Sequence, residues 1–190
     1  WDAGADGFRF DAAKHIESPE DPGCGSDFWP TVINGIKSYA PGVYVYGELL
    51  DSLGGGQPDS NYTKYMSITD NSWGNTVRNN VVNGSNAGAF AYGYHKGATA
   101  DKLVIWAESH DTYAGEGSGS VSVRNINKTW ALVAARANAM GLYLARPNSL
   151  SSQKLGDAAV TGWANPEVGA VNKFHNHFAG QGEWVSSENG

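Results

Sequence analysis

The sequence predicts an α/β fold in which parallel strands alternate with helices. Three apolar, strand-like runs each lead directly to a carboxylate, and these carboxylates are Asp11, Glu48 and Asp111. The intervals between the runs are long enough for the crossover helices that parallel strands require. Because such crossovers place the carboxyl ends of the strands on one side of the sheet, the three carboxylates are expected to converge there. In an eight-stranded α/β barrel, that side carries the active site.

The first half of the chain contains three of the expected strands. A strand over residues 6–11 is followed by a loop rich in Pro, Gly and Asp and by an amphipathic helix over 27–40. The apolar positions Phe28, Val32, Ile36 and Tyr39 recur there at helical spacing. Pro41 and Gly42 end this helix and lead to the second strand, which precedes Glu48. A polar loop over 51–62, a weaker strand over 65–69 and a helix over 74–82 follow.

The second half gives fewer clear strands. Residues 83–101 are rich in Gly and Ala and give no definite prediction, and a strand over 103–107 leads to His110 and Asp111. Apolar residues predict a buried helix over 127–140, with Gly141 as its terminator. A long loop over 148–165 then leads to a final helix over 166–179.

The pair Arg9 and Asp11 combines two charges on one face of the first strand. Side chains alternate between the faces of a strand, so these two project to one side and Phe8 and Phe10 to the other. The adjacent positive charge favours the ionised form of Asp11 and lowers its pKa. Such a carboxylate suits nucleophilic attack, although a structural ion pair explains the two residues equally well.

Three segments of the sequence resemble signature regions of the α-amylase superfamily of glycoside hydrolases. They are GFRFDAAKH at residues 7–15, GELL at 47–50 and ESHD at 108–111. Residues 141–147 resemble the last barrel strand of that family, and residues 171–176 resemble the helix after it. The resemblance implies that residues 1–180 form part of a TIM (β/α)8 barrel, roughly strands 4 to 8 with their helices. Residues 181–190 would begin a C-terminal β-sheet domain.

The resemblance also implies roles for individual residues. Asp11 would be the nucleophile, Glu48 the general acid and then the general base, and Asp111 the group that holds sugar hydroxyls and favours a distorted ring. The implied substrate-binding residues are Arg9, Lys14, His15 and His110. Arg9 would orient Asp11, His110 would bind the reacting sugar, and Lys14 and His15 would line the leaving-group side.

The chemistry of retaining hydrolysis explains why two different carboxyl groups are needed. One must be ionised and the other protonated, at a separation of roughly 5–5.5 Å. Arg9 supplies a charge beside Asp11, whereas Glu48 has apolar neighbours and no sequence-adjacent cation. Burial and two nearby aspartates are therefore expected to raise the pKa of Glu48.

The implied activity is hydrolysis of internal α-1,4-glucosidic bonds of starch and maltooligosaccharides by a retaining α-amylase. An α-glucosidase or a transglycosylase with the same three carboxylates is an alternative, as is a glucan-binding relative without catalysis. A complete barrel has typically ~250 residues, whereas this chain has 190. We therefore expect a fragment whose exposed sheet edges make it inactive in isolation.

Composition and charge exclude several other classes of protein. A net charge of −6 argues against nucleic-acid partners, and no apolar stretch approaches the ~20 residues of a membrane span. The single cysteine, Cys24, excludes a disulfide within the chain. Few lysines and many Gly, Asn, Ser and Trp residues favour a secreted, extracellular enzyme, and the full-length protein is expected to be a monomer.

Two histidine sites raise the question of metal binding. By the family resemblance, His15 would offer its backbone carbonyl to a structural Ca²⁺, whose oxygen ligands would otherwise lie outside this chain. His175 and His177 point about 200° apart on a helix, so a structural role is favoured. Of the residues around His110, we expect Glu108 and Ser109 to be scaffold, and Tyr113 is a candidate for the lining of the cleft.

Overall fold

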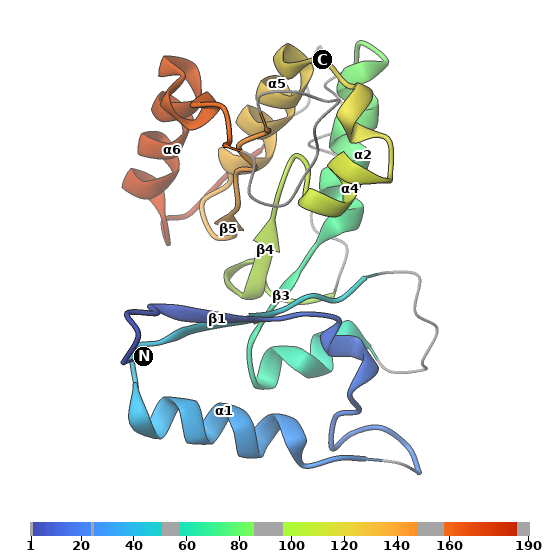
Figure 1. Ribbon diagram of the computed structural model, residues 1–190, viewed down its shortest axis with the longest axis vertical. Helices are drawn as coiled ribbons and strands as arrows, with labels where there is room; N and C mark the ends of the chain where they lie inside the picture. Colours follow the sequence, from blue (N-terminus) through green and yellow to red (C-terminus); the bar gives the residue numbers. More distant parts are fainter. Residues whose placement is uncertain (1, 24, 51–57, 86–96, 148–157, 186–190) are drawn as a thin grey trace. The chain divides into compact units, whose positions relative to one another are not determined.

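The computed structural model describes residues 2–23, 25–50, 58–85, 97–147 and 158–185. The chain forms two compact units. Trp1–Asn71 and Tyr94–Val104 form the first unit, and Ser72–Gly93 and Ile105–Gly190 form the second. Figure 1 shows the helices and strands of both.

The first unit is built on parallel strands. These are β1 (Gly7–Phe10), β2 (Tyr44–Gly47), β3 (Ser67–Thr69) and β4 (Leu103–Ile105), whose last residue belongs to the second unit. Neighbouring strands in this series pair in parallel, and the register places Phe10 opposite Gly47. With β5, hydrogen bonds connect the strands in the order β1-β2-β3-β4-β5. The predicted α/β class is therefore confirmed.

Helix α1 (Phe28–Tyr39) lies along one side of β1 in the first unit (Figure 1). Its position matches the prediction, but the predicted buried face is wrong. Trp29 and Ile33 are buried, whereas Phe28 and Tyr39 are 37% and 66% exposed. The large Trp29 ring directs the helix: it meets the Phe10 ring edge-on at 5.3 Å between centroids, and its indole N–H donates to the Ile16 carbonyl at 3.0 Å.

Close packing at the end of β2 explains the glycine before Glu48. A Cβ atom at Gly47 would lie 2.7 Å from Met66 Sδ and 2.9 Å from Ala13 Cβ. Ala13 belongs to a short 3₁₀ helix, η1 (Ala13–His15), which follows Asp11. Two further 3₁₀ helices complete the unit, η2 (Asp59–Lys64) and η3 (Ala100–Lys102).

The second unit contains most of the helices. They are α2 (Asn71–Val82), whose first residue belongs to the first unit, α4 (His110–Ala114), α5 (Val123–Ala134) and α6 (Pro166–Phe178). Strand β5 (Met140–Gly141) and the 3₁₀ helices η4 (Ser118–Ser120) and η6 (Gly162–Ala164) lie between them. Helix α6 confirms the prediction over 166–179, and α2 begins three residues before the predicted start.

The prediction of a helix over 127–140 is wrong at both ends. Helix α5 begins at Val123 because the Ser122 hydroxyl caps it by accepting from the Asn125 N–H. It ends at Ala134, so Gly141 does not terminate it but lies in β5. A Cβ atom at Gly141 would lie 2.8 Å from the Trp130 ring, so close packing rather than helix capping requires the glycine.

The remaining predictions concern segments without assigned helices or strands. The predicted loops over 51–62 and 148–165 lie partly outside the described residues, as does much of 83–101. Residues 182–185 have no regular secondary structure and 186–190 lie outside the described residues, so a following sheet domain stays a prediction.

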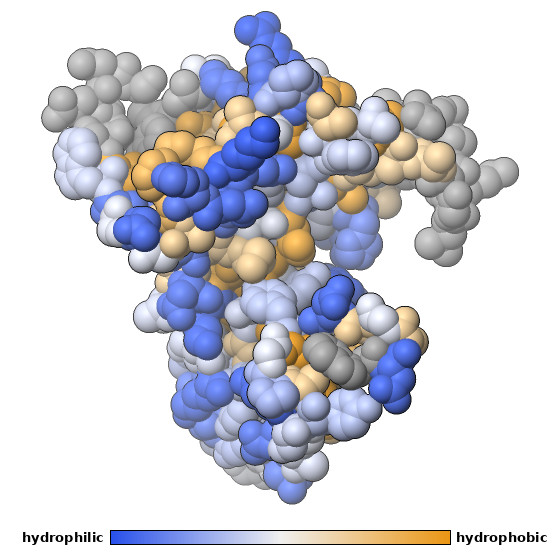
Figure 2. All heavy atoms as spheres, turned by 90° about the vertical axis from the view of Figure 1, so that its left-hand side faces the viewer, coloured by the Kyte–Doolittle hydropathy of each residue, from blue (hydrophilic) through white to orange (hydrophobic). Residues whose placement is uncertain are grey.

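In the described part of the chain, every helix is too short or too polar to cross a membrane. Apolar and polar patches are interspersed on the face shown in Figure 2.

Candidate active site

Asp11 and Glu48 lie side by side at the carboxyl ends of β1 and β2. Phe10 and Gly47 are the last paired residues of the two strands; Asp11 directly follows Phe10, and Glu48 directly follows Gly47. Backbone pairing continues past them, because the Glu48 N–H donates to the Phe10 carbonyl at 2.9 Å and the Ala13 N–H donates to the Glu48 carbonyl at 3.0 Å. The strand register therefore brings the two carboxylates together, as the sequence predicted.

Arg9 links the two carboxylates. Its Nη1 lies 2.6 Å from Asp11 Oδ1 and its Nη2 lies 2.9 Å from Glu48 Oε1. Both contacts involve one small planar group, so they hold the two carboxylate oxygens within about 8 Å of each other. The predicted pairing of Arg9 with Asp11 is confirmed. Glu48 has no cation adjacent to it in the sequence, but the pairing of β1 with β2 brings the same arginine to it.

The environments of the two carboxylates differ in exposure. The Asp11 side chain is 76% exposed, whereas that of Glu48 is only 9% exposed. Burial alone lowers the pKa of Arg9, but its hydrogen bond to Asp11 and the charges of Glu48 and Asp11 outweigh burial and raise it. The guanidinium is therefore a permanent cation between one accessible and one buried carboxylate.

Tyr46 is a further ionisable side chain near Arg9 and Glu48. It lies opposite Arg9 in the β1–β2 register. Burial raises the pKa of the Tyr46 hydroxyl, the Arg9 charge lowers it, and the Glu48 charge raises it further. The Tyr46 phenol therefore stays neutral near Arg9 and Glu48.

The second Glu48 oxygen binds the backbone at Ala12. The Ala12 N–H donates to Glu48 Oε2 at 3.0 Å. Ala12 adopts a left-handed backbone conformation with φ of 46°, which is unfavourable for a residue with a Cβ atom. Such outliers cluster at functional sites, and here the conformation directs a donor at the buried carboxylate.

Lys14 and His15 lie in η1, which directly follows this site. Lys14 Nζ pairs with Asp59 Oδ1 at 3.0 Å, and both side chains are largely buried, whereas His15 is exposed. No group of three or more His, Cys, Asp or Glu side chains suited to a metal occurs in the described ranges. The His15 carbonyl alone does not make a calcium site, so Ca²⁺ binding stays a prediction.

His110 and Asp111 are the first two residues of α4 in the second unit. His110 Nε2 lies 3.3 Å from Asp111 Oδ2, and the two side chains are 64% and 51% exposed. Ser109 caps this helix through a reciprocal pair of hydrogen bonds with Thr112. The sequence predicted that these two residues follow a strand; the structure adds that a capped helix presents them.

The neighbours of His110 and Asp111 form a buried polar cluster. Glu108 is 2% exposed and pairs with Arg146, whose Nε lies 2.7 Å from Glu108 Oε1. Tyr113, a candidate for the cleft lining, is 7% exposed, and the Arg146 guanidinium lies 5.2 Å from its ring centroid. Sequence reasoning missed Arg146, although a lone charge within an apolar strand-like segment was an available signal.

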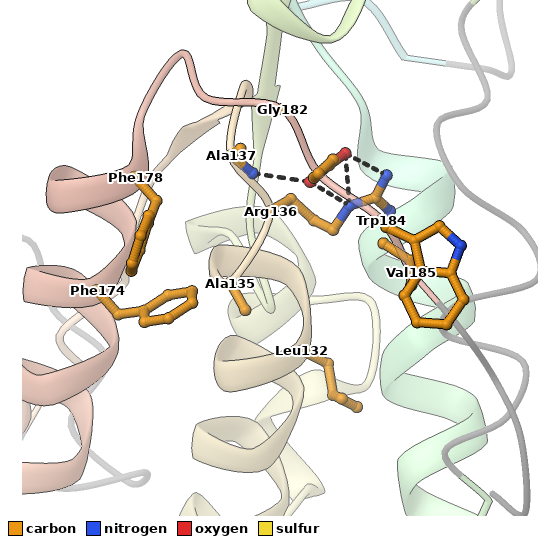
Figure 3. Close-up of a pocket in the computed structure, with 10 residues that line it drawn as sticks. Leu132, Ala135, Arg136, Ala137, Phe174, Phe178, Gly182, Trp184 and Val185 are labelled. Carbon is orange, nitrogen blue, oxygen red and sulfur yellow. Dashed lines mark hydrogen bonds and ion pairs between the residues drawn. The ribbon is translucent and has the colours of Figure 1, made fainter.

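A separate hollow in the second unit contains none of the predicted site residues. It has a volume of about 430 Å³ and is lined by parts of α5 and α6 and by residues 182–185 (Figure 3). Arg136 contacts the Glu183 carboxylate there at 2.7 Å. Near it, His175 Nδ1 lies 2.8 Å from the Arg136 carbonyl oxygen, as expected for a structural histidine.

Comparisons with known proteins connect this geometry to one family, although no family model matches the chain. An α-amylase of Clostridium acetobutylicum is 32% identical over 99% of the chain, and one of Butyrivibrio fibrisolvens is 31% identical over 98%. These matches cover 24% and 22% of the two relatives, so the chain spans about a quarter of their length.

Solved structures show the same fold. α-Amylase I of Eisenia fetida matches with a TM-score of 0.59 at 18% identity, over 91% of this chain and 42% of that one. A mutant of that enzyme in complex with maltohexaose matches with a TM-score of 0.52 at 20% identity, over 86% and 35%. The fold is thus part of an α/β barrel of the α-amylase type. The sequence matches and the fold together support an assignment to the α-amylase superfamily.

Proposed function

We propose that this chain supplies the nucleophile and the acid/base of a retaining glycoside hydrolase that cleaves internal α-1,4 bonds of α-glucans. The observation that carries the proposal is the bridge that Arg9 forms between Asp11 and Glu48. A shared guanidinium at the carboxyl ends of two adjacent parallel strands is a suitable arrangement for two cooperating carboxyl groups.

The different exposures support different roles for the two carboxyl groups. Asp11, accessible and paired with Arg9, attacks the anomeric carbon as the bond to the leaving oxygen breaks and Glu48 donates a proton to that oxygen. Glu48 then removes a proton from water, which attacks the same carbon and releases Asp11. Two displacements return the original anomeric configuration.

We further propose that Asp111 and His110 bind hydroxyl groups of the reacting sugar. Both side chains are exposed at the start of a capped helix, so they are available to a ligand. One structural relative, a mutant of α-amylase I from Eisenia fetida, forms a complex with the oligosaccharide maltohexaose. A linear maltooligosaccharide is therefore the substrate to test first.

The test replaces Glu48 by glutamine in the protein at its full natural length. Glutamine keeps the shape but cannot donate a proton to the leaving group, so hydrolysis of a maltooligosaccharide should fall by at least ~10²-fold. Glu17→Gln, at an exposed glutamate of the same unit, is the matched control and should retain activity. Undiminished hydrolysis by Glu48→Gln would refute the assigned role.

Product analysis separates the related activities. Early release of mixed internal fragments with the α configuration supports a retaining endo-acting α-amylase. Single glucose units would indicate an α-glucosidase, and products longer than the substrate a transglycosylase. Binding without hydrolysis would indicate a non-catalytic glucan-binding protein. We expect the 190-residue chain by itself to show no hydrolysis.

A further inference from the structure

Glu108, which lies two residues before the exposed His110, forms a buried ion pair with Arg146. We infer that Glu108 and Arg146 are positioning residues for Asp111: the pair fixes the turn that presents the Asp111 carboxylate to substrate. The inference rests on the proposed function, because it assumes that Asp111 binds the reacting sugar.

The geometry of the pair allows little freedom. Arg146 Nε lies 2.7 Å from Glu108 Oε1, and Arg146 Nη2 lies 2.9 Å from Glu108 Oε2. Such parallel double contacts fix orientation as well as distance. The side chains are only 1% and 11% exposed, so water cannot readily replace either partner.

Hydrogen bonds extend from this pair to the first turn of α4. The Ser118 hydroxyl donates to Glu108 Oε2 at 2.9 Å and lies 3.1 Å from Thr112 Oγ1. Thr112 Oγ1 accepts from the Ser109 N–H at 2.9 Å, and the Thr112 N–H donates to the Ser109 hydroxyl at 3.2 Å. The pair is therefore connected to the residues on both sides of His110 and Asp111.

Arg146 also holds the loop after α4. Its Nη1 donates to the Val121 carbonyl and its Nη2 to the Ser118 carbonyl, both at 2.9 Å. The guanidinium lies 5.2 Å from the ring centroid of Tyr113, the third residue after His110. Because the Asp111 side chain is half exposed, its direction depends on the backbone that these contacts fix.

The second unit offers a matched control. Arg136 and Glu183 form another double-contact pair, with nitrogen–oxygen distances of 2.7 and 3.1 Å. It ties the chain after α5 to the segment after α6 (Figure 3). The two pairs share their chemistry but hold different segments.

The test compares Arg146→Lys with Arg136→Lys in the full-length protein. We expect amide hydrogen exchange of residues 112–115 to become at least ~10-fold faster in Arg146→Lys and to stay unchanged in Arg136→Lys. With maltooligosaccharide as substrate, kcat should fall about 10-fold in Arg146→Lys and add no further loss to Asp111→Asn, because coupled residues are not additive. If Arg146→Lys does not fold, Glu108→Gln, which keeps the side-chain volume, is measured in the same way.

Two results would overturn the inference. One is unchanged exchange over 112–115 in a folded variant. The other is an equal fold-loss of kcat from Arg146→Lys in the wild-type and the Asp111→Asn backgrounds, because the arginine would then act elsewhere. Absence of hydrolysis by the wild-type protein would instead refute the proposed function, and exchange would still show whether the pair anchors α4.

Discussion

Arg9 and Glu48 lie 2.9 Å apart, one within β1 and the other just after β2. The same guanidinium contacts Asp11 at 2.6 Å. One side chain therefore joins the carboxylates of two neighbouring strands, and no other described contact links them as directly. This arrangement makes Arg9 the residue whose replacement should disturb both groups at once.

Arg9→Lys should lower kcat/KM by at least ~10-fold, since a lysine keeps the charge but lacks the planar fork that binds two carboxylates. Steady-state kinetics on a maltooligosaccharide measures the effect. Arg124→Lys, at an exposed arginine of α5, is the control and should leave kcat/KM unchanged. An Arg9→Lys enzyme with activity within twofold of wild type would show that the bridge has no catalytic role.

Gly47→Ala should reduce the free energy of unfolding by about 1–3 kcal/mol, because the new methyl group would overlap Met66 and Ala13. Gly35→Ala provides the control: it lies in α1 with no atom within 4 Å of the added Cβ. Since alanine favours a helix over glycine, that change should stabilise the protein by up to about 1 kcal/mol. Urea denaturation measures both, and equal effects of the two substitutions would contradict the packing argument.

The raised pKa of Tyr62 predicts how the free energy of unfolding changes at alkaline pH. Burial, with the nearby charges of Asp21, Asp59 and Glu17, raises the pKa of Tyr62 to about 12, above its usual value of about 10. The folded state therefore disfavours the phenolate, and the stability linked to the neutral hydroxyl is complete below pH ~10 and is lost as the pH rises toward ~12.

The difference in unfolding free energy between wild type and Tyr62→Phe isolates this contribution. Below pH ~10, wild type should be the more stable by about 1 kcal/mol, since the Tyr62 hydroxyl donates to the Ile16 carbonyl at 3.1 Å. The advantage should shrink between pH ~10 and ~12. A constant difference across that range would contradict the assigned shift.

Local sequence predicted those features that depend on neighbouring residues. Helix α1 was recognisable from apolar spacing, and the Arg9–Asp11 pair followed from alternation along β1. The choice of buried face on α1 failed because it depends on what Trp29 packs against, which spacing alone does not specify.

The sequence predicted that Asp11 and Glu48 approach each other, but it did not reveal which side chains of distant segments are in contact. The contact between Arg9 and Glu48 requires the register of β1 against β2. The pair of Glu108 and Arg146 joins residues 38 positions apart and depends on how the chain after β5 returns to the start of α4. Both sets of charges were visible in the sequence, but their partners were not.

Trapping the covalent intermediate tests the central claim most directly. Incubating the full-length protein with a fluorinated maltosyl fluoride, which slows the second displacement, should leave one glycosyl group attached. Peptide mass mapping should place that group on Asp11 in the wild-type protein and find none in Asp11→Asn. A label on any other residue, or active turnover by Asp11→Asn, would contradict the account.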